Sequence, residues 1–229
     1  IMLGVAEALD CSNRHLLHFS LSHYIEIDDD TTIFTKAYRR DFNRDWDRLN
    51  RFESNRTIAS ILQAPNTGLN SLFMAILRGE RDSLLNDDTL LQTLNDRTYY
   101  SQGVQTKLLK DVSFDDVDLA LEIGFRAHQD QVERLHRDRF YVMRSGALAR
   151  ATRTDEVTIS NKDQVSALAG YVNSNWTWAN LTASAGIRVE RISADAKDNL
   201  MATDISTSDT IVMPVSYAHL TLPTLDSVR

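Results

Sequence analysis

Long stretches of this chain of 229 residues alternate apolar with polar residues, and this alternation is the strongest constraint on its fold. In the clearest stretch, apolar residues occupy every second position: Val117, Leu119, Leu121, Ile123, Phe125 and Ala127. The positions between them include Asp118, Glu122, Arg126 and His128. Because successive side chains of a β-strand point to opposite faces, the pattern predicts a strand with one apolar and one polar face.

The same alternation recurs along the chain and predicts about six long strands. Two of them form a hairpin in residues 15–46, where Asp28, Asp29 and Asp30 supply the turn. The other strands begin at Arg97, Val117, Gln164 and Asn180. Each strand has room for about a dozen residues, whereas strands in soluble proteins usually have about five or six.

Short and long connections alternate between these strands. We expect tight turns at residues 28–30, within 110–116 and within 175–180, with long polar segments between them. Short turns on one side and long loops on the other are typical of outer-membrane barrels, in which about nine to eleven residues of each strand cross the membrane. We therefore predict an all-β fold: an antiparallel up-and-down transmembrane β-barrel, present as a partial barrel with long extracellular loops.

The longest connection, residues 47–96, contains one helical pattern. Within NTGLNSLFMAILRGE, apolar residues recur at helical spacing: Leu69, Leu72, Phe73, Ile76 and Leu77. Gly79 follows the pattern and is a suitable stop signal. We predict a short helix that packs this loop.

Four aromatic residues lie where the predicted barrel would meet the membrane surface. Trp176 and Trp178 flank a predicted turn, and Tyr99 and Tyr100 begin a predicted strand. Amphipathic rings favour the boundary between lipid and water, so we predict that these residues belong to an aromatic girdle. The alternative is a pair of turn aromatics in a soluble sheet.

Charge and residue counts exclude several kinds of site. The net charge of -7 and the pI near 5.3 argue against a nucleic-acid partner. Cys11 is the only cysteine, so an internal disulfide or a multi-cysteine metal site is impossible. His15, His18 and His23 do not converge on a metal, because alternation places His18 on the opposite face from the other two.

Catalytic motifs are missing as well. The sequence HRDRF at residues 136–140 is similar to a kinase catalytic loop, but it lacks a glycine-rich phosphate loop and is expected in a loop. We therefore predict that the chain is not an enzyme and uses no cofactor. The first residues, IMLGVAEAL, lack a basic flank and a cleavage site, and we expect the chain to be an internal piece of a longer protein.

Several segments resemble the barrel of TonB-dependent outer-membrane receptors, nearest to the ferric-dicitrate branch of siderophore receptors. They occur in the family's order: TKAYRRDFNRDWDRLNRF (35–52), NDRTYYSQGVQTKL (95–108), LEIGFRAHQDQVERLHRDRFYVM (121–143) and LTASAGIRVE (181–190). The resemblance covers most of residues 13–192. None of these segments is a catalytic motif, so the resemblance implies architecture and transport more firmly than it identifies a ligand.

The resemblance implies a large barrel with a plug in the outer membrane of a Gram-negative bacterium. It implies ferric siderophore or ferric citrate as cargo, outer-membrane lipid around the barrel, and the TonB complex as a partner of the plugged, N-terminal part. We recognise no plug, TonB box, signal peptide or aromatic C-terminal strand in this sequence. We therefore expect a fragment that does not transport by itself, because lipid cannot satisfy the open edges of a partial barrel.

Arginines near the strand ends are candidates for cargo contacts, because a guanidinium group pairs well with carboxylates. The candidates are Arg40, Arg44, Arg126, Arg137 and Arg139. The alternative is that they solvate the loops or pair with neighbouring carboxylates, such as Asp41, Asp45 and Asp138. No metal ligands are predicted.

The C-terminal residues form a separate segment in our prediction. VSYAHLTLPT, within residues 215–229, resembles the translation of a common transposase sequencing adapter, with Ala218 as the mismatch. We therefore divide the chain into a partial barrel domain at residues 1–214 and a non-native tail at residues 215–229, as expected for a metagenomic fragment. The alternative for the tail is a genuine strand with Pro214 at its start.

A second class of function stays open at the level of sequence. The same alternation fits a soluble or secreted antiparallel β-sheet module that binds a ligand and has no catalytic activity. Such a module needs a second sheet to cover the apolar faces and tolerates shorter strands. The strand lengths favour the barrel.

Overall fold

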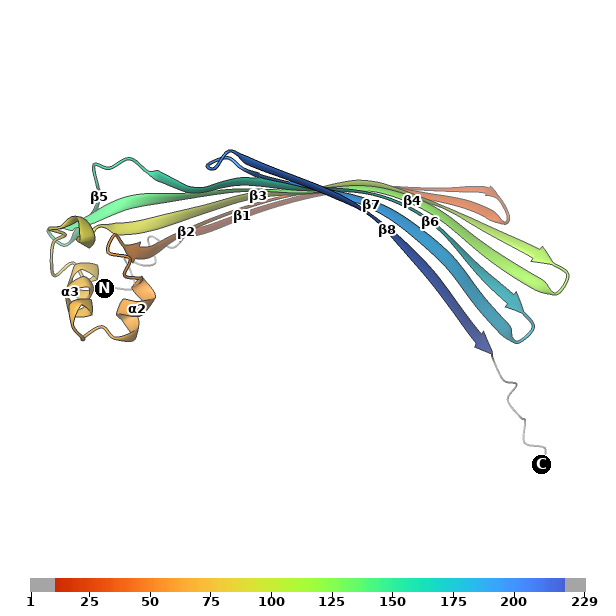
Figure 1. Ribbon diagram of the computed structural model, residues 1–229, viewed down its shortest axis with the longest axis horizontal. Coiled ribbons are helices and arrows are strands. Elements are labelled where there is room, and N and C mark those ends of the chain that lie inside the picture. The colour runs from red at the N-terminus through yellow and green to blue at the C-terminus, as the bar shows by residue number, and fades with distance from the viewer. Residues whose placement is uncertain (1–10, 221–229) are drawn as a thin grey trace, which may run out of the picture.

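Residues 11–220 are described by the computed structural model, and their strands form one arched antiparallel sheet (Figure 1). The sheet has eight strands: β1 (Cys11–Asp28), β2 (Thr31–Phe52), β3 (Leu90–Phe114), β4 (Val117–Arg144), β5 (Ala147–Arg150), β6 (Glu156–Trp178), β7 (Leu181–Asp198) and β8 (Thr203–Leu220). Neighbours in the sheet follow chain order, except that β5 pairs with β4 alone. The predicted all-β, up-and-down antiparallel fold is confirmed. Within the described range, β1 and β8 are open edges, so the sheet is not closed.

The strand register places apolar residues from successive strands on one face of the sheet. Ile123 pairs with Leu108 on β3 and with Val172 on β6, and Val172 pairs with Ile187 on β7. We call this side the apolar face, and many of its side chains are exposed: Leu17, Phe19, Leu21, Ile123, Phe125, Leu168, Val172 and Ile187. The alternation predicted for β4 and β7 is confirmed.

The other side, which we call the polar face, carries the intervening residues. Glu122 pairs with Asn173 in β6, and Arg126 pairs with Gln105 in β3. In β8 the pattern is reversed, because Ile211 and Met213 pair with Glu190 and Arg188 on the polar face. The separation of the two faces therefore holds from β1 to β7.

The strands are much longer than predicted, reaching 28 residues in β4. As a result, residues 136–140 lie inside β4 and not in a loop, and the connection between β2 and β3 shrinks to residues 53–89. Tyr99 and Tyr100 lie within β3 and on opposite faces, so they do not begin a strand. Beyond the apolar stretch, apolar and polar residues are mixed on both faces, so the alternation is lost although the backbone ladder continues.

Two strands were not predicted, so the expected number of about six strands was too low. β5 has only four residues, and β8 runs through a segment rich in serine, threonine and aspartate. The connection between β7 and β8 is a turn at residues 199–202, and not a long excursion. The turns predicted around Asp29, Asp115 and Ala179 are present.

β8 includes residues 215–220, the first part of the segment that we set apart as a tail. Pro214 lies inside β8 and pairs with Ile187, at an edge strand, where a residue without a backbone N–H is tolerated. Residues 221–229 and the N-terminal IMLGVAEAL lie outside the described residues. The origin of the tail stays a prediction.

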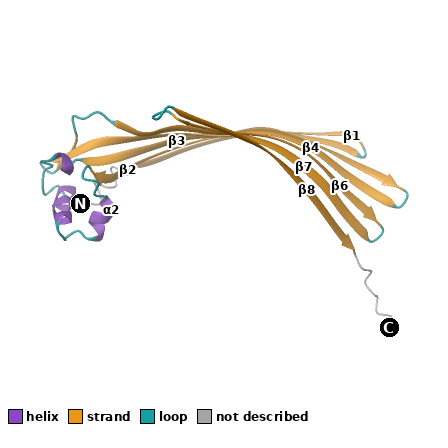
Figure 2. Cartoon of the chain, viewed as in Figure 1, coloured by secondary structure: helices purple, strands orange, loops and turns teal. Residues whose placement is uncertain are grey.

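In residues 11–220, the helices lie at one end of the sheet, between β2 and β3 (Figure 2). They are α2 (Ile58–Gln63), α3 (Leu69–Leu77) and the 3-10 helix η1 (Asn86–Asp88). The predicted helix is confirmed as α3, and Gly79 follows it with a φ of 73°. We call residues 53–89 the helical cap.

The helical cap has its own apolar core, which is shared with the ends of the strands. The core residues are Leu49, Phe52, Ile61, Phe73, Met74, Ile76, Leu77, Leu90 and Met143. The rings of Phe52 and Phe73 lie 4.6 Å apart, centroid to centroid. Ser83 links the cap to β4 through two hydrogen bonds. Its backbone N–H donates to the Met143 carbonyl, and its hydroxyl oxygen accepts from the Met143 N–H. The cap is thus a packed unit.

Candidate ligand site on the polar face

The polar face contains a hollow of about 330 Å³ that spans β1 to β4. It is lined by His18, Lys36, Tyr38, Arg40, Ser101, Gln105, Arg126 and His128, and we call this set the cationic bowl. The strand register explains how these residues meet. His18 pairs with Arg40 across β1 and β2, and Gln105 of β3 lies between Lys36 and Arg126.

Two cations of the polar face that lie outside the bowl, Lys107 and Arg188, have carboxylate partners. Nearer the short turns, Lys107 Nζ lies 3.7 Å from Glu122 Oε2, and Arg188 Nη2 lies 3.0 Å from Glu190 Oε2. The described residues provide no such partner for the three cations of the bowl, and no carboxylate lines the hollow. Gathered positive charges without counter-charges repel one another, so the bowl favours an anion.

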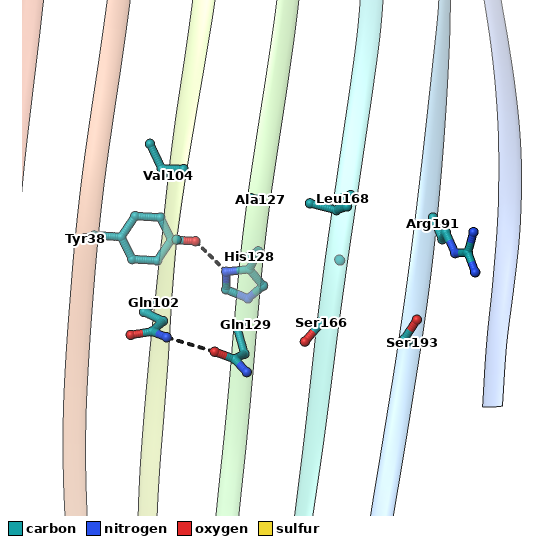
Figure 3. A pocket seen from close by; sticks show the side chains of 12 residues that line it. Tyr38, Gln102, Val104, Ala127, His128, Gln129, Ser166, Leu168, Arg191 and Ser193 are labelled. Carbon is teal, nitrogen blue, oxygen red and sulfur yellow. Dashed lines mark hydrogen bonds between the residues drawn. The ribbon is translucent and has the colours of Figure 1, made fainter. Parts of the chain in front are cut away.

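Tyr38 and His128 form a hydrogen-bonded pair in the bowl (Figure 3). Tyr38 lies across Gly103, where an added Cβ would be 2.8 Å from the tyrosine Oη, so glycine leaves the space that the ring needs. Tyr38 Oη is 2.5 Å from His128 Nδ1, and His128 Nε2 is 2.7 Å from Asp130 Oδ2. A carboxylate accepts from Nε2–H, and in the neutral imidazole the other nitrogen, Nδ1, then accepts from the tyrosine hydroxyl.

Arg126 completes this arrangement, because its Nη2 donates to Tyr38 Oη at 3.1 Å. Its Nε is buried and has no partner among the described residues. The guanidinium group is thus held in place by the tyrosine while part of its donor capacity is unused. Such a group can donate further hydrogen bonds to an anionic ligand.

The five predicted arginines do not form one cluster. Arg40 and Arg126 both line the cationic bowl. Arg44 lies four residues beyond Arg40 on the same face of β2, and its Cζ is 5.7 Å from the Trp46 ring centroid. Arg137 and Arg139 lie on the apolar-face side of β4, beyond the apolar residues. Arg139 pairs there with carboxylates of Asp47 and Asp155, at 3.4 and 3.8 Å.

The sequence did not identify most residues of the bowl as members of a site. Lys36, Tyr38 and His128 occupy ordinary polar positions of strands, and only the register shows that they share a hollow. The prediction that the three N-terminal histidines do not converge is confirmed, because His15 and His23 pair with Asn43 and Thr35 on the other face.

A second hollow, of about 570 Å³, is lined mostly from the apolar-face side (Figure 3). Gln102 Nε2 donates to Gln129 Oε1 at 2.8 Å, and apolar side chains such as Val104 and Leu168 lie beside this pair. The only charged side chain of its lining is Arg191. This hollow marks the level at which the apolar face becomes polar.

His136 lies on the polar face of β4, further from the short turns than the bowl. Its pKa is below its ordinary value of 6.5 because the side chain is partly buried and because Arg97 and Arg134 are positively charged. Since the unfolded chain binds this proton more readily, protonation as the pH falls below about 6.5 favours unfolding.

Replacing Arg97 with glutamine is expected to raise the pKa of His136. The change removes one nearby positive charge, while the burial that also lowers the pKa is retained. A pH titration of histidine resonances by NMR checks this result. Arg191→Gln, on the other face, is the control, and an unchanged His136 pKa in Arg97→Gln would contradict the interaction.

The described residues contain no group of three or more His, Cys, Asp or Glu side chains arranged to hold a metal ion. No helix in residues 11–220 is both long enough and apolar enough to span a membrane.

Comparisons with known proteins find similarity at the level of structure alone. No protein-family model matches the sequence, and no curated protein matches it. The fold is similar to the ferric citrate transporter FecA in the unliganded form, with a TM-score of 0.65 and 12% identity over 95% of this chain. This chain spans 26% of that protein.

Two further solved structures from Acinetobacter baumannii are similar. BauA, the ferric preacinetobactin receptor, gives a TM-score of 0.53 with 8% identity, covering 89% of this chain and 27% of that one. The siderophore receptor PiuA gives 0.50 with 10% identity, covering 90% and 29%. At these identities the likeness establishes the fold. The three proteins are described as a transporter and receptors, and not as enzymes.

Proposed function

We propose that this chain is part of the barrel wall of a TonB-dependent receptor that takes up ferric siderophore or ferric citrate through a Gram-negative outer membrane. The observation that carries the proposal is the separation of the two faces from β1 to β7. One face exposes apolar side chains, while the other is polar and holds the cationic bowl. An outer-membrane barrel has this arrangement, with lipid outside and a polar lumen.

The exposed apolar face supports lipid as its partner. Leu17, Phe19 and Leu21 are each more than 60% exposed on β1, and Leu168 is 54% exposed on β6. Large contiguous apolar surfaces are rare on soluble monomers and indicate a partner or a membrane. The apolar stretch of β4, Val117 to Ala127, has the length that barrel strands need to cross a membrane.

The solved neighbours support the cargo. FecA is a ferric citrate transporter, and BauA is a ferric preacinetobactin receptor. Ferric chelates of this kind are anionic, and the bowl presents unpaired cations on the side that becomes the lumen. We propose Arg40, Arg44 and Arg126 as cargo contacts, while Arg137 and Arg139 stay predictions.

The TonB complex and the plug, which lie outside this chain, complete the proposed receptor. Energy for cargo release would come from the TonB complex, acting on a plug that the remaining sequence of the receptor supplies. We keep residues 1–214 as the barrel part and residues 215–229 as a proposed non-native tail.

Neutralising the bowl tests the cargo site. In the complete receptor, the double variant Arg40→Gln/Arg126→Gln is expected to lower uptake of radiolabelled ferric citrate or a ferric catecholate by at least about tenfold, because two charge-assisted contacts are lost. Uptake in a host without its own receptors for these chelates is the measurement.

The matched control removes the same charge from the other face. Arg39→Gln/Arg191→Gln changes two arginines that lie outside the bowl and is expected to leave uptake unchanged. Equal uptake in both double variants and the parent would overturn the assignment of the cargo site.

A further inference from the structure

Four arginines form a row across the polar face at one level of the sheet. Arg44 of β2 pairs with Arg14 of β1 and with Arg97 of β3, and Arg97 pairs with Arg134 of β4. We call these residues the arginine row. Like charges directly opposite one another on neighbouring strands destabilise a sheet, so four in succession carry a cost that needs an explanation.

Protein groups offset little of this repulsion. The one ion pair that the described residues give the row joins Arg134 to Asp163 at 3.9 Å, near the upper limit for such a contact. Arg97 Nε donates to the amide oxygen of Asn95, which is uncharged, and Arg134 Nε is buried without a partner. The row therefore keeps unused donors and uncompensated positive charge, which an anion can satisfy.

Between the arginine row and the cationic bowl lies an apolar strip. Phe42 of β2 pairs with Leu16 of β1 and with Tyr99 of β3, and Tyr99 pairs with Val132 of β4. The Phe42 and Tyr99 rings are 5.6 Å apart, and both line a hollow of about 310 Å³ that begins at Arg40. The hollow thus contains a cation of the bowl and the apolar rings, and its lining also includes the carboxylates of Asp130 and Asp163, beside which an uncharged middle of a ligand fits better than an acidic end.

The polar face therefore presents three zones in sequence along β2: cations at Arg40, apolar rings at Phe42, and cations again at Arg44. Arg40 and Arg44 are four residues apart, which corresponds to about 13 Å along a strand. A compact anion can occupy one cationic zone but cannot reach both. A longer ligand can reach both and also cover the apolar strip.

We propose that the ligand of this face is an elongated molecule with an acidic group at each end and an apolar or aromatic middle. One acidic end binds the cationic bowl, the middle lies on Phe42 and Tyr99, and the other end binds the arginine row. The inference rests on the proposed function and narrows its cargo: an elongated siderophore can reach both cationic zones, whereas a compact chelate such as ferric citrate reaches only one.

Rigid dicarboxylates test the inference without knowledge of the natural ligand. Binding of a terphenyl dicarboxylate and of the matching terphenyl monocarboxylate to the purified complete receptor is compared by titration calorimetry. We expect the dicarboxylate to bind about tenfold more tightly, because the second carboxylate gains charge-assisted contacts with the row. Equal affinities would overturn the inference.

Variants of the row locate the second contact. Arg97→Gln is expected to remove most of the tenfold difference, and Arg14→Gln, on the exposed strand β1, provides a second variant if the first one folds poorly. Arg191→Gln, on the other face, should retain the difference. A difference that persists in both variants of the row would overturn the assignment.

Carboxylate binding and ferric-chelate uptake distinguish a failure of the inference from a failure of the proposed function. Equal binding of the two carboxylates, with ferric-chelate uptake still lowered by Arg40→Gln/Arg126→Gln, would overturn the inference alone. Unchanged uptake in that double variant would overturn the proposed cargo site, even if the dicarboxylate still binds more tightly than the monocarboxylate.

Discussion

Replacing Phe52 with alanine is expected to unfold the helical cap. Phe52 is completely buried, at the point where the end of β2 meets the helices, and its ring packs against Phe73. Removing a buried phenylalanine side chain costs about 3 to 5 kcal/mol, partly because a cavity is left behind. A cap with a core this small has few other contacts that could compensate for the loss.

Limited proteolysis checks this result. The Phe52→Ala variant should be cleaved rapidly within residues 53–89 while the long strands stay intact, and hydrogen exchange should increase in the same segment. Leu72→Ala is the control, because Leu72 lies on the exposed side of α3 and is 42% exposed. Equal protection of Phe52→Ala and the parent would show that the core does not hold the cap.

If the chain belongs to the receptor proposed above, replacing Leu121 with arginine in the complete protein is expected to impair insertion of the barrel. Leu121 lies on the apolar face, near the middle of the apolar stretch of β4, and pairs with Ser174 of β6. An arginine on the lipid side at the middle of a bilayer costs about 2 to 4 kcal/mol. Leu21→Arg, on β1, should have the same effect.

The measurement is the fraction of receptor that is folded in outer-membrane preparations, judged by its altered migration on gels without heating. Asn173→Arg is the matched control, because Asn173 lies at similar depth on the polar face and pairs with Glu122. The control should assemble normally. Normal assembly of Leu121→Arg would contradict the assignment of the apolar face to lipid.

The alternation of residues was sufficient to predict the two faces and most of the turns. Leu121 and Ile123 are on the expected side, and the turns near Asp29, Asp115 and Ala179 are where turn-forming residues occur. These features depend on local chemistry, since a strand has a period of two residues and aspartate stabilises tight turns.

Strand length and the cationic bowl could not be predicted in this way. Beyond the apolar stretch both faces carry a mixture of apolar and polar residues, so the sequence has no period that marks the continuing strands. The bowl depends on the register between strands that are distant in sequence: Tyr38 meets His128, which lies 90 residues further along the chain. Of the five predicted arginines, Arg40 and Arg126 line the bowl, and both lie within strands and not at strand ends.

The length of the strands determines how far the helical cap stands from the apolar part of the sheet. Between Ala127 and Met143, β4 continues for roughly 50 Å at about 3.3 Å per residue, which amounts to roughly 40 Å of height at the usual strand tilt. With the apolar face in a bilayer, the cap would stand well above the lipid headgroups. It would then be an epitope on intact cells, and antibodies against residues 53–89 would report surface display without disturbing the membrane.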